Sequence, residues 1–252
     1  MCINVIGIDF SKDNSKCGIA FAEVSNNSCK IFAVGTQKEI PIKTISPLIK
    51  TKKCILAVDA PLGWPKIMGT VLENHVAGQY IEKQANSLFR RKTDDFVYEK
   101  TGKRSLDVGA DKIARTAHGA LNLINTLRQQ TNLPIPLAWD HKNIDGTKVI
   151  EVYPAATLIQ YGHKLNGYKK KDKDGCNIRK NLLKQFPKNI IIDRQVEQET
   201  ITDNDNVFDA VLCIIAGFDF LQGNAYSPAE SNATIDCVKK EGWIWFRNHK
   251  NQ

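Results

Sequence analysis

The sequence predicts a mixed α/β fold, in which an antiparallel meander of three strands is extended by parallel strands and flanked by helices. Three observations predict it. Short apolar runs alternate with turns over residues 3–35, another apolar run at 54–61 follows a helical segment, and a long helical pattern covers 202–223. The chain has 252 residues, 42% of them hydrophobic, which is enough for a substantial core. We expect a single domain over residues 1–252.

The first strands are expected at residues 3–10, 16–24 and 28–35, separated by the polar turns SKDNS and SNN. Turns this short favour antiparallel neighbours. Residues 41–53 then suit a short amphipathic helix, and the run CILAVDAP at 54–61 suits a strand. If the helix is a right-handed crossover, this strand lies parallel to the first.

The second half of the chain continues the alternation. Residues 66–132 are expected to form a helical insertion rich in polar and basic groups. A strand pattern returns in TKVIEVYPAATL, where Pro154 ends the strand. A short helix at 177–186 and a strand or extended link at 189–193 precede the late helix, for which Thr202 or Asp203 is a suitable cap.

Composition narrows the class of protein. The chain carries 35 Lys and Arg against 27 Asp and Glu, a formal charge of +8, which favours anionic partners such as nucleic acid. Its seven cysteines are scattered and form no zinc motif, as is typical of a reducing cytosol. Asn4 and Asp9 interrupt the apolar stretch near the start, and no run reaches about 18 apolar residues. We therefore expect a cytoplasmic protein without a membrane segment.

Asp9 and Asp59 each end an apolar strand pattern. If the two strands are parallel neighbours, both carboxylates emerge at the same edge of the sheet. Two carboxylates at one edge repel each other unless a cation lies between them, and Mg²⁺ or Mn²⁺ is the natural choice. The alternative is that each aspartate only caps a loop.

Two further acids are candidates for the same site. Glu151 lies within an apolar run, where an unpaired carboxylate is costly, although an edge strand would expose it to solvent. Asp203 and Asp205 suit the positive end of the helix dipole. Asp209 lies one turn beyond Asp205, where the buried stripe begins, and capping explains it poorly.

A basic segment supplies candidates for contact with an anionic substrate. It lies between two aromatic residues, so that we expect it to be anchored while its polar groups stay available. The candidates are Arg90, Arg91, Lys92 and Thr93. The second basic stretch, YKKKDKD at 168–174, is by default a solvated loop with a modest prospect of phosphate contact.

The order of these elements resembles the RNase H-like fold, whose nucleases gather carboxylates around two divalent ions. Six short stretches that span nearly the whole chain carry a closer resemblance; they are GIDFS, AVDAPLGWP, FRRKTD, EVYPAA, DNVFDAVLCIIAG and EGWIW. In these stretches the chain resembles family 429 of the domains of unknown function, bacterial and archaeal proteins predicted to be RNase H-like nucleases.

This resemblance implies a metal centre formed by Asp9, Asp59 and Asp209, with Glu151 approaching the same edge as a fourth catalytic carboxylate. Holliday-junction resolvases of this fold place another acid one turn before the residue that matches Asp209. This sequence has Asn206 there, which should weaken a second ion.

The implied function is a nuclease that hydrolyses phosphodiester bonds of DNA or RNA with Mg²⁺ or Mn²⁺. Arg90, Arg91 and Lys92 would hold the scissile strand. Two alternatives remain open. A phosphotransferase of the sugar-kinase and actin type begins with a similar strand, Asp and polar turn, but a second IDFS-like phosphate loop is absent. A nucleic-acid-binding protein that keeps the fold without catalysis is the other.

Overall fold

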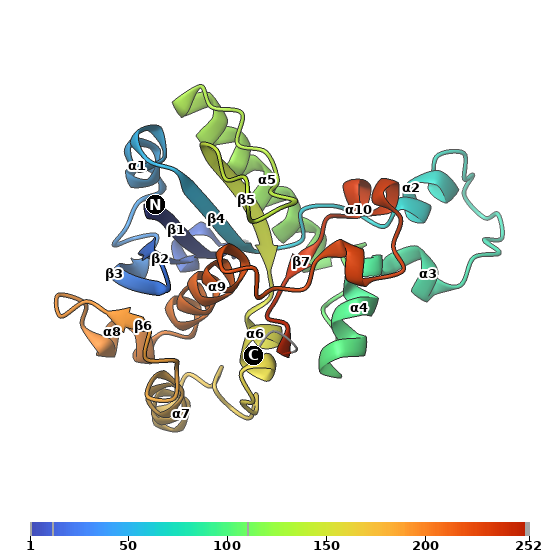
Figure 1. Ribbon diagram of the computed structural model, residues 1–252. Coiled ribbons are helices and arrows are strands. Elements are labelled where there is room, and N and C mark those ends of the chain that lie inside the picture. Colours follow the sequence, from blue (N-terminus) through green and yellow to red (C-terminus); the bar gives the residue numbers. More distant parts are fainter. Residues whose placement is uncertain (1, 12, 110, 250–252) are drawn as a thin grey trace.

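A seven-stranded mixed sheet forms the centre of the protein (Figure 1). The computed structural model describes residues 2–11, 13–109 and 111–249. The strand order is β6-β3-β2-β1-β4-β5-β7. The strands are β1 (Cys2–Asp9), β2 (Gly18–Ser25), β3 (Ser28–Thr36), β4 (Cys54–Asp59), β5 (Thr147–Val152), β6 (Ile190–Ile192) and β7 (Ile244–Trp245).

The sheet confirms the predicted class. Strands β1, β2 and β3 form the antiparallel meander, and the turns between them are short. Strand β4 pairs with β1 in parallel, β5 pairs with β4 in parallel, and β7 and β6 add parallel strands at the two edges. This mixed pattern is consistent with an RNase H-like fold.

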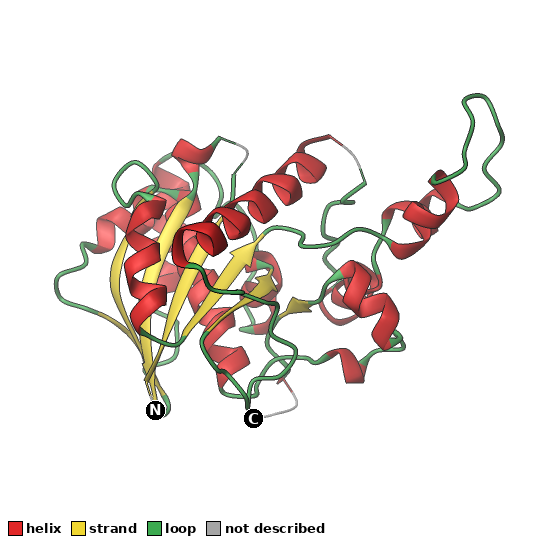
Figure 2. Ribbon diagram, turned by 90° about the horizontal axis from the view of Figure 1, so that it is seen from above, coloured by secondary structure: helices red, strands yellow, loops and turns green. Residues whose placement is uncertain are grey.

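Helices cover both faces of the sheet (Figure 2). They are α1 (Ile45–Thr51), α2 (Lys66–Leu72), α3 (Ala85–Phe89), α4 (Lys92–Thr101), α5 (Asp111–Thr131), α6 (Pro154–Gln160), α7 (Lys173–Leu183), α8 (Gln198–Asp203), α9 (Asp205–Leu221) and α10 (Ile235–Glu241). Short 3₁₀ turns lie at Asn14–Lys16, Ile42–Thr44 and Pro228–Glu230. Within the described part of the chain, none of the helices has the length and apolarity needed to cross a membrane.

Side chains alternate along each strand, so that the sheet has two cores. On β1, Val5 packs in the core that contains α9, whereas Ile6 and Ile8 pack in the core that contains α1 and α5. On β4, Ala57 faces the α9 side and Val58 the α5 side. Alternation therefore directs the last residues of β1 and β4, Asp9 and Asp59, to the side of α9.

Glycines allow α9 to approach the sheet closely. A Cβ on Gly7 of β1 would lie 2.1 Å from the Ala210 carbonyl oxygen, and one on Gly18 of β2 would lie 1.9 Å from the Asn206 carbonyl oxygen. Any larger side chain at these positions would push the helix away. The first turns of α9 are therefore fixed against the strand that ends on Asp9.

The predicted helical insertion, 66–132, is helical but divides into two parts. Helix α5 packs on the sheet through Ala120, Leu123 and Leu127, so it belongs to the core layer rather than to an insertion. Helices α2 and α3 and the loop between them extend away from the sheet (Figures 1 and 2).

The start of the late helix differs from the prediction. Neither Thr202 nor Asp203 caps it, because both belong to the short helix α8. Asn204 is the cap of α9, and its side-chain oxygen accepts hydrogen bonds from the backbone N–H groups of Asn206 and Val207. Asn204 is also a residue type that favours the cap position, and it caps α9 because the chain breaks between α8 and α9 at this residue.

Candidate metal centre

Three carboxylates meet at one edge of the sheet. Asp9 and Asp59 are direct partners in the parallel pairing of β1 and β4, and Asp209 lies on the second turn of α9, 1% exposed. One carboxylate oxygen from each residue lies within 4.8 Å of the others. The structure therefore brings together the three residues that the sequence predicted as metal ligands.

Burial and mutual repulsion disfavour three negative charges in this space. Burial and the charges of Asp209 and Asp59 raise the pKa of Asp9 well above its usual range. Burial and the charge of Asp209 raise the pKa of Asp59 to about 7. The pKa of Asp209 is also raised by burial, although Lys169 opposes the shift. The carboxylates lack sufficient compensating positive charge, as is typical of a cation site.

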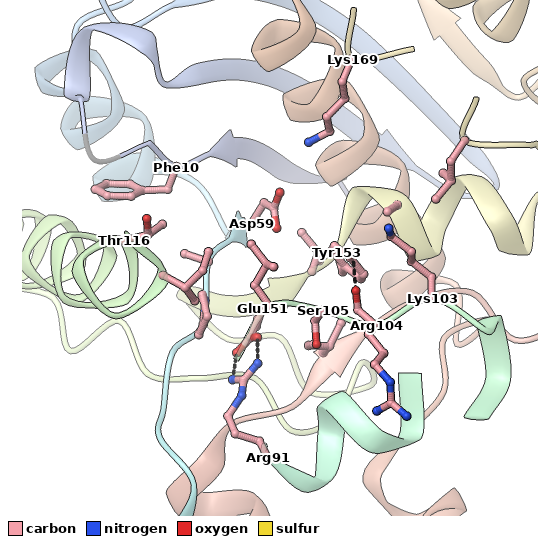
Figure 3. Close-up of a pocket in the computed structure, with 18 of the residues that line it drawn as sticks. Phe10, Asp59, Arg91, Lys103, Arg104, Ser105, Thr116, Glu151, Tyr153 and Lys169 are labelled. Atoms are coloured by element: carbon pink, nitrogen blue, oxygen red, sulfur yellow. Dashed lines mark hydrogen bonds and ion pairs between the residues drawn. The ribbon is translucent and has the colours of Figure 1, made fainter. Parts of the chain in front are cut away.

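Lys169 is the cation nearest to this group among the described residues. Its Nζ lies 2.6 Å from Asp209 Oδ2. The other oxygen, Asp209 Oδ1, is buried and makes no hydrogen bond. Figure 3 shows the Lys169 side chain reaching from its loop toward the edge where Asp59 lies. Lys169 belongs to the basic stretch that the sequence assigned to a solvated loop.

Glu151, predicted to approach the same edge, lines the same cavity as Asp59 but does not join the carboxylate group. It pairs in register with Val58, one residue before Asp59, and alternation therefore turns it to the opposite face. Its oxygens accept hydrogen bonds from the Leu62 backbone N–H at 2.9 Å and from both terminal nitrogens of Arg91. Figure 3 shows Glu151 and Arg91 pointing toward each other, away from Asp59.

Arg91 is a structural residue in this arrangement. It is 1% exposed, and all five of its N–H donors are used within the protein. Its guanidinium bonds Asp94 through Nε and Nη2, Glu151 through Nη1 and Nη2, and the Glu241 carbonyl oxygen through Nη1. We call these four residues the Arg91 cluster. It joins α4, β5 and α10, and leaves no donor of Arg91 for a substrate phosphate.

The other three residues predicted to contact a substrate lie in different environments. Thr93 is buried and accepts a hydrogen bond from the Ile244 backbone N–H at 2.8 Å. Arg90 pairs with Asp107 at 3.4 Å. Lys92 has an exposed side chain. The structure therefore does not bring these residues together with the carboxylates, and only Arg91 among the four lines the cavity beside them.

A cavity of about 500 Å³ opens beside the carboxylates. Asp59 and Lys169 line it, together with Lys103, Arg104 and Tyr153 from other segments (Figure 3). The Tyr153 hydroxyl donates a hydrogen bond to the Arg104 carbonyl oxygen at 3.3 Å, which links the loop after α4 to the end of β5. The space is large enough for a ligand the size of a nucleotide.

The sequence interpretation did not select Lys103 or Arg104, and it included Lys169 only within the stretch 168–174, to which it gave a modest prospect of phosphate contact. Lys103 and Arg104 follow Gly102, which ends α4 with a positive φ of 67° and turns the chain. The sequence Gly-Lys-Arg could have indicated this, because a glycine that ends a helix places the basic residues after it in a loop. Nothing in the run of lysines at 169–171 distinguishes Lys169 from its neighbours.

Fold and site together define an α/β protein with a three-carboxylate group at the ends of two parallel strands. A family model described as "Protein of unknown function (DUF429)" matches residues 7–233. The chain therefore belongs to the DUF429 family, as the resemblance predicted. A comparison with curated proteins gives no match.

Proposed function

We propose that this protein is a divalent-metal-dependent nuclease that hydrolyses phosphodiester bonds of nucleic acid. The observation that carries the proposal is the group formed by Asp9, Asp59 and Asp209, whose oxygens lie within 4.8 Å of one another. This group lies beside a cavity whose lining includes Lys103, Arg104 and Lys169. Acids for a metal and cations for an anionic substrate are the two components that this chemistry needs.

The residues present fit Mg²⁺ or Mn²⁺. Carboxylate oxygens are the ligands that these hard cations prefer. Asp209 Oδ1 is buried without a hydrogen bond, which is costly unless a ligand satisfies it. The raised pKa values of Asp9 and Asp59 show that their negative charge is poorly compensated by the protein alone. Asp9, Asp59 and Asp209 would hold the ion.

When bound, the ion lowers the pKa of a water molecule and stabilises negative charge on phosphate oxygens. The protein fold determines the positions of the carboxylates that would hold the ion. The pairing of β1 and β4 fixes Asp9 beside Asp59, and the close approach at Gly7 fixes α9 and so Asp209. Lys169 lines the cavity, where its ammonium attracts a phosphate.

Lys103 and Arg104 add positive charge on the other side of the cavity. The Arg104 guanidinium carbon lies 3.7 Å from the centre of the Tyr98 ring, an arrangement that holds the side chain in place. These residues take the role in substrate binding that the sequence assigned to Arg90, Arg91, Lys92 and Thr93. The formal charge of +8 favours the approach of an anionic polymer in general.

The test is cleavage of labelled single-stranded and double-stranded DNA and RNA with Mn²⁺, with Asp209→Asn as the key variant. We expect cleavage by the wild type and none by Asp209→Asn. Asp219→Asn is the matched control, because Asp219 is also a fully buried acid on α9 that pairs with a cation, Arg247. It should lose stability but keep its activity per folded molecule.

Equal cleavage by wild type and Asp209→Asn would contradict the proposal. Binding of nucleic acid with no cleavage by any form of the protein would favour the non-catalytic alternative.

A further inference from the structure

We infer that the carboxylate group holds a single divalent ion and that Lys169 supplies, as a built-in ammonium, the positive charge that a second ion would otherwise bring. The inference deepens the proposed function and rests on it. It also assigns Lys169 a role in substrate binding, because Lys169 lines the cavity.

The two oxygens of Asp209 have different surroundings. Oδ2 is 2.6 Å from Lys169 Nζ, whereas Oδ1 is buried and has no hydrogen bond. Lys169 therefore uses one oxygen, and the other has only the buried Tyr168 hydroxyl, itself without a hydrogen bond, near this carboxylate. An ion and the ammonium are able to share Asp209 instead of competing for it.

Lys169 is held in place by the residues on either side of it. The buried Arg179 donates from Nη1 to the carbonyl oxygens of both Tyr168 and Lys170, the latter at 2.9 Å, and from Nε to the Thr202 carbonyl oxygen at 2.6 Å. Lys170 also packs closely against Gly175, where a Cβ would lie 2.0 Å from the Lys170 carbonyl oxygen. The backbone on both sides of Lys169 is therefore fixed, unlike that of a solvated loop.

The ring of Tyr168 connects the backbone segment held by Arg179 to the helix that carries Asp209. It is 3% exposed and lies 5.9 Å from the ring of Phe208, the residue directly before Asp209. The loop and the first turns of α9 thus form one packed unit. This packing explains how a side chain that is itself 57% exposed is directed to Asp209.

Charge favours one ion. Three ionised carboxylates carry −3 and Lys169 carries +1, which leaves −2, the charge that one divalent ion neutralises. A second ion would make the group +2, an arrangement that mutual repulsion disfavours. Asp205, one turn before Asp209, adds negative charge nearby but lies outside the group whose oxygens converge within 4.8 Å.

A fourth ligand for a second ion is missing from the described residues around the group. The Asn206 side chain donates from Nδ2 to the Lys16 carbonyl oxygen at 2.7 Å, and Asn206 carries no negative charge. Glu151 is held by Arg91 on the other face. The acid that would complete a two-ion site is therefore paired elsewhere.

The experiment is calorimetric titration of the metal-free protein with MnCl₂, combined with electron paramagnetic resonance of the loaded form. The variants are Lys169→Met, which removes the charge at similar length, and Lys170→Met, an exposed neighbour, as the matched control. Because the Lys169 side chain is 57% exposed and Arg179 holds the backbone on both sides of it, both variants should fold, which circular dichroism verifies.

We expect the wild type to bind one Mn²⁺ per chain with the resonance spectrum of an isolated ion. Lys169→Met should bind Mn²⁺ at least about tenfold more tightly, because a positive charge close to the ion has been removed. Lys170→Met should match the wild type. In the loaded proteins, Lys169→Met should bind a labelled ten-nucleotide single strand at least about tenfold more weakly than the wild type does.

Other results overturn the inference. Two coupled Mn²⁺ ions in the wild type, or unchanged Mn²⁺ affinity in Lys169→Met, would contradict the role of Lys169 while leaving a metal-dependent nuclease intact. Binding of Mn²⁺ by Lys169→Met but not by the wild type would show that the ammonium and the ion exclude each other. Binding by neither protein would remove the proposed function as well.

Discussion

Replacing Arg91 by methionine is expected to cost about 4 to 5 kcal/mol of the free energy of unfolding at pH 7. Removing one partner of a buried ion pair costs about 3–5 kcal/mol, because the remaining charge is left buried and unpaired. Arg91 leaves two such charges, Asp94 at 2.9 Å and Glu151 at 2.7 Å, both at most 5% exposed. The cost should therefore lie at the upper end of the range.

Urea unfolding followed by tryptophan fluorescence measures this cost. Arg90→Met is the matched control: its ion pair with Asp107 is partly exposed and 3.4 Å long, so the loss should stay within about 1 kcal/mol. The loss in the free energy of unfolding of Arg91→Met, relative to the wild type, should become smaller as the pH falls toward 5. Burial already raises the pKa of Glu151 against the attraction of Arg91, and without Arg91 the protonated form is the stable one.

A combined variant sharpens the test. Glu151→Met added to Arg91→Met should recover part of the lost stability, since an apolar pair replaces a lone buried charge. If Arg91→Met instead unfolds within about 1 kcal/mol of the wild type at pH 7, the Arg91 cluster is not the structural unit described above and a substrate-binding role for Arg91 returns.

Three further predictions concern the carboxylates and the helix that carries one of them. In metal-free protein, Asp9→Asn should raise the melting temperature by roughly 2–4 °C, because it removes repulsion, and should abolish stabilisation by Mn²⁺; equal stabilisation of variant and wild type would place the ion elsewhere. The pKa of Asp59 is raised from 3.8 to about 7 in the folded protein, so metal-free stability should fall as the pH rises from about 4 to about 7 and then level off, while Mn²⁺ affinity measured by titration should rise up to about pH 7; a flat profile between these pH values would contradict the assignment. Gly7→Ala should cost at least about 3 kcal/mol and weaken Mn²⁺ binding, because its Cβ would lie 2.1 Å from the Ala210 carbonyl oxygen, whereas Gly69→Ala, with open space around it, should be neutral or stabilising in the same unfolding assay.

The meander, the parallel strand β4 and the meeting of Asp9 with Asp59 were predictable from the sequence. Each depends on local signals, namely strand periodicity, short turns and one right-handed crossover. The register that makes Asp9 and Asp59 direct partners then follows from the position of each residue at the end of its strand.

The role of Glu151 was not predictable in the same way. A single residue of register separates its partner Val58 from Asp59, and this one step decides which face of the sheet the side chain reaches. Its position in an apolar run correctly indicated a buried acid, but the run contains nothing that identifies the partner.

The partners of Arg91 and Lys169 come from long-range packing. Arg91 meets Glu151, 60 residues away, and the Glu241 carbonyl, 150 residues away. Lys169 is selected from a run of three lysines only because Arg179 fixes the backbone around it. Composition predicts that the surface carries many basic residues, but the tertiary structure decides which of them is buried, paired or directed into the site.

A crystal soaked in MnCl₂ and measured for the anomalous signal of manganese tests the metal centre most directly. We expect a peak within about 2.5 Å of one carboxylate oxygen each from Asp9, Asp59 and Asp209, with Lys169 still bonded to Asp209. A map without a peak between these three carboxylates, or with manganese bound only elsewhere on the protein, would contradict the proposed metal centre and the proposed nuclease function that depends on it.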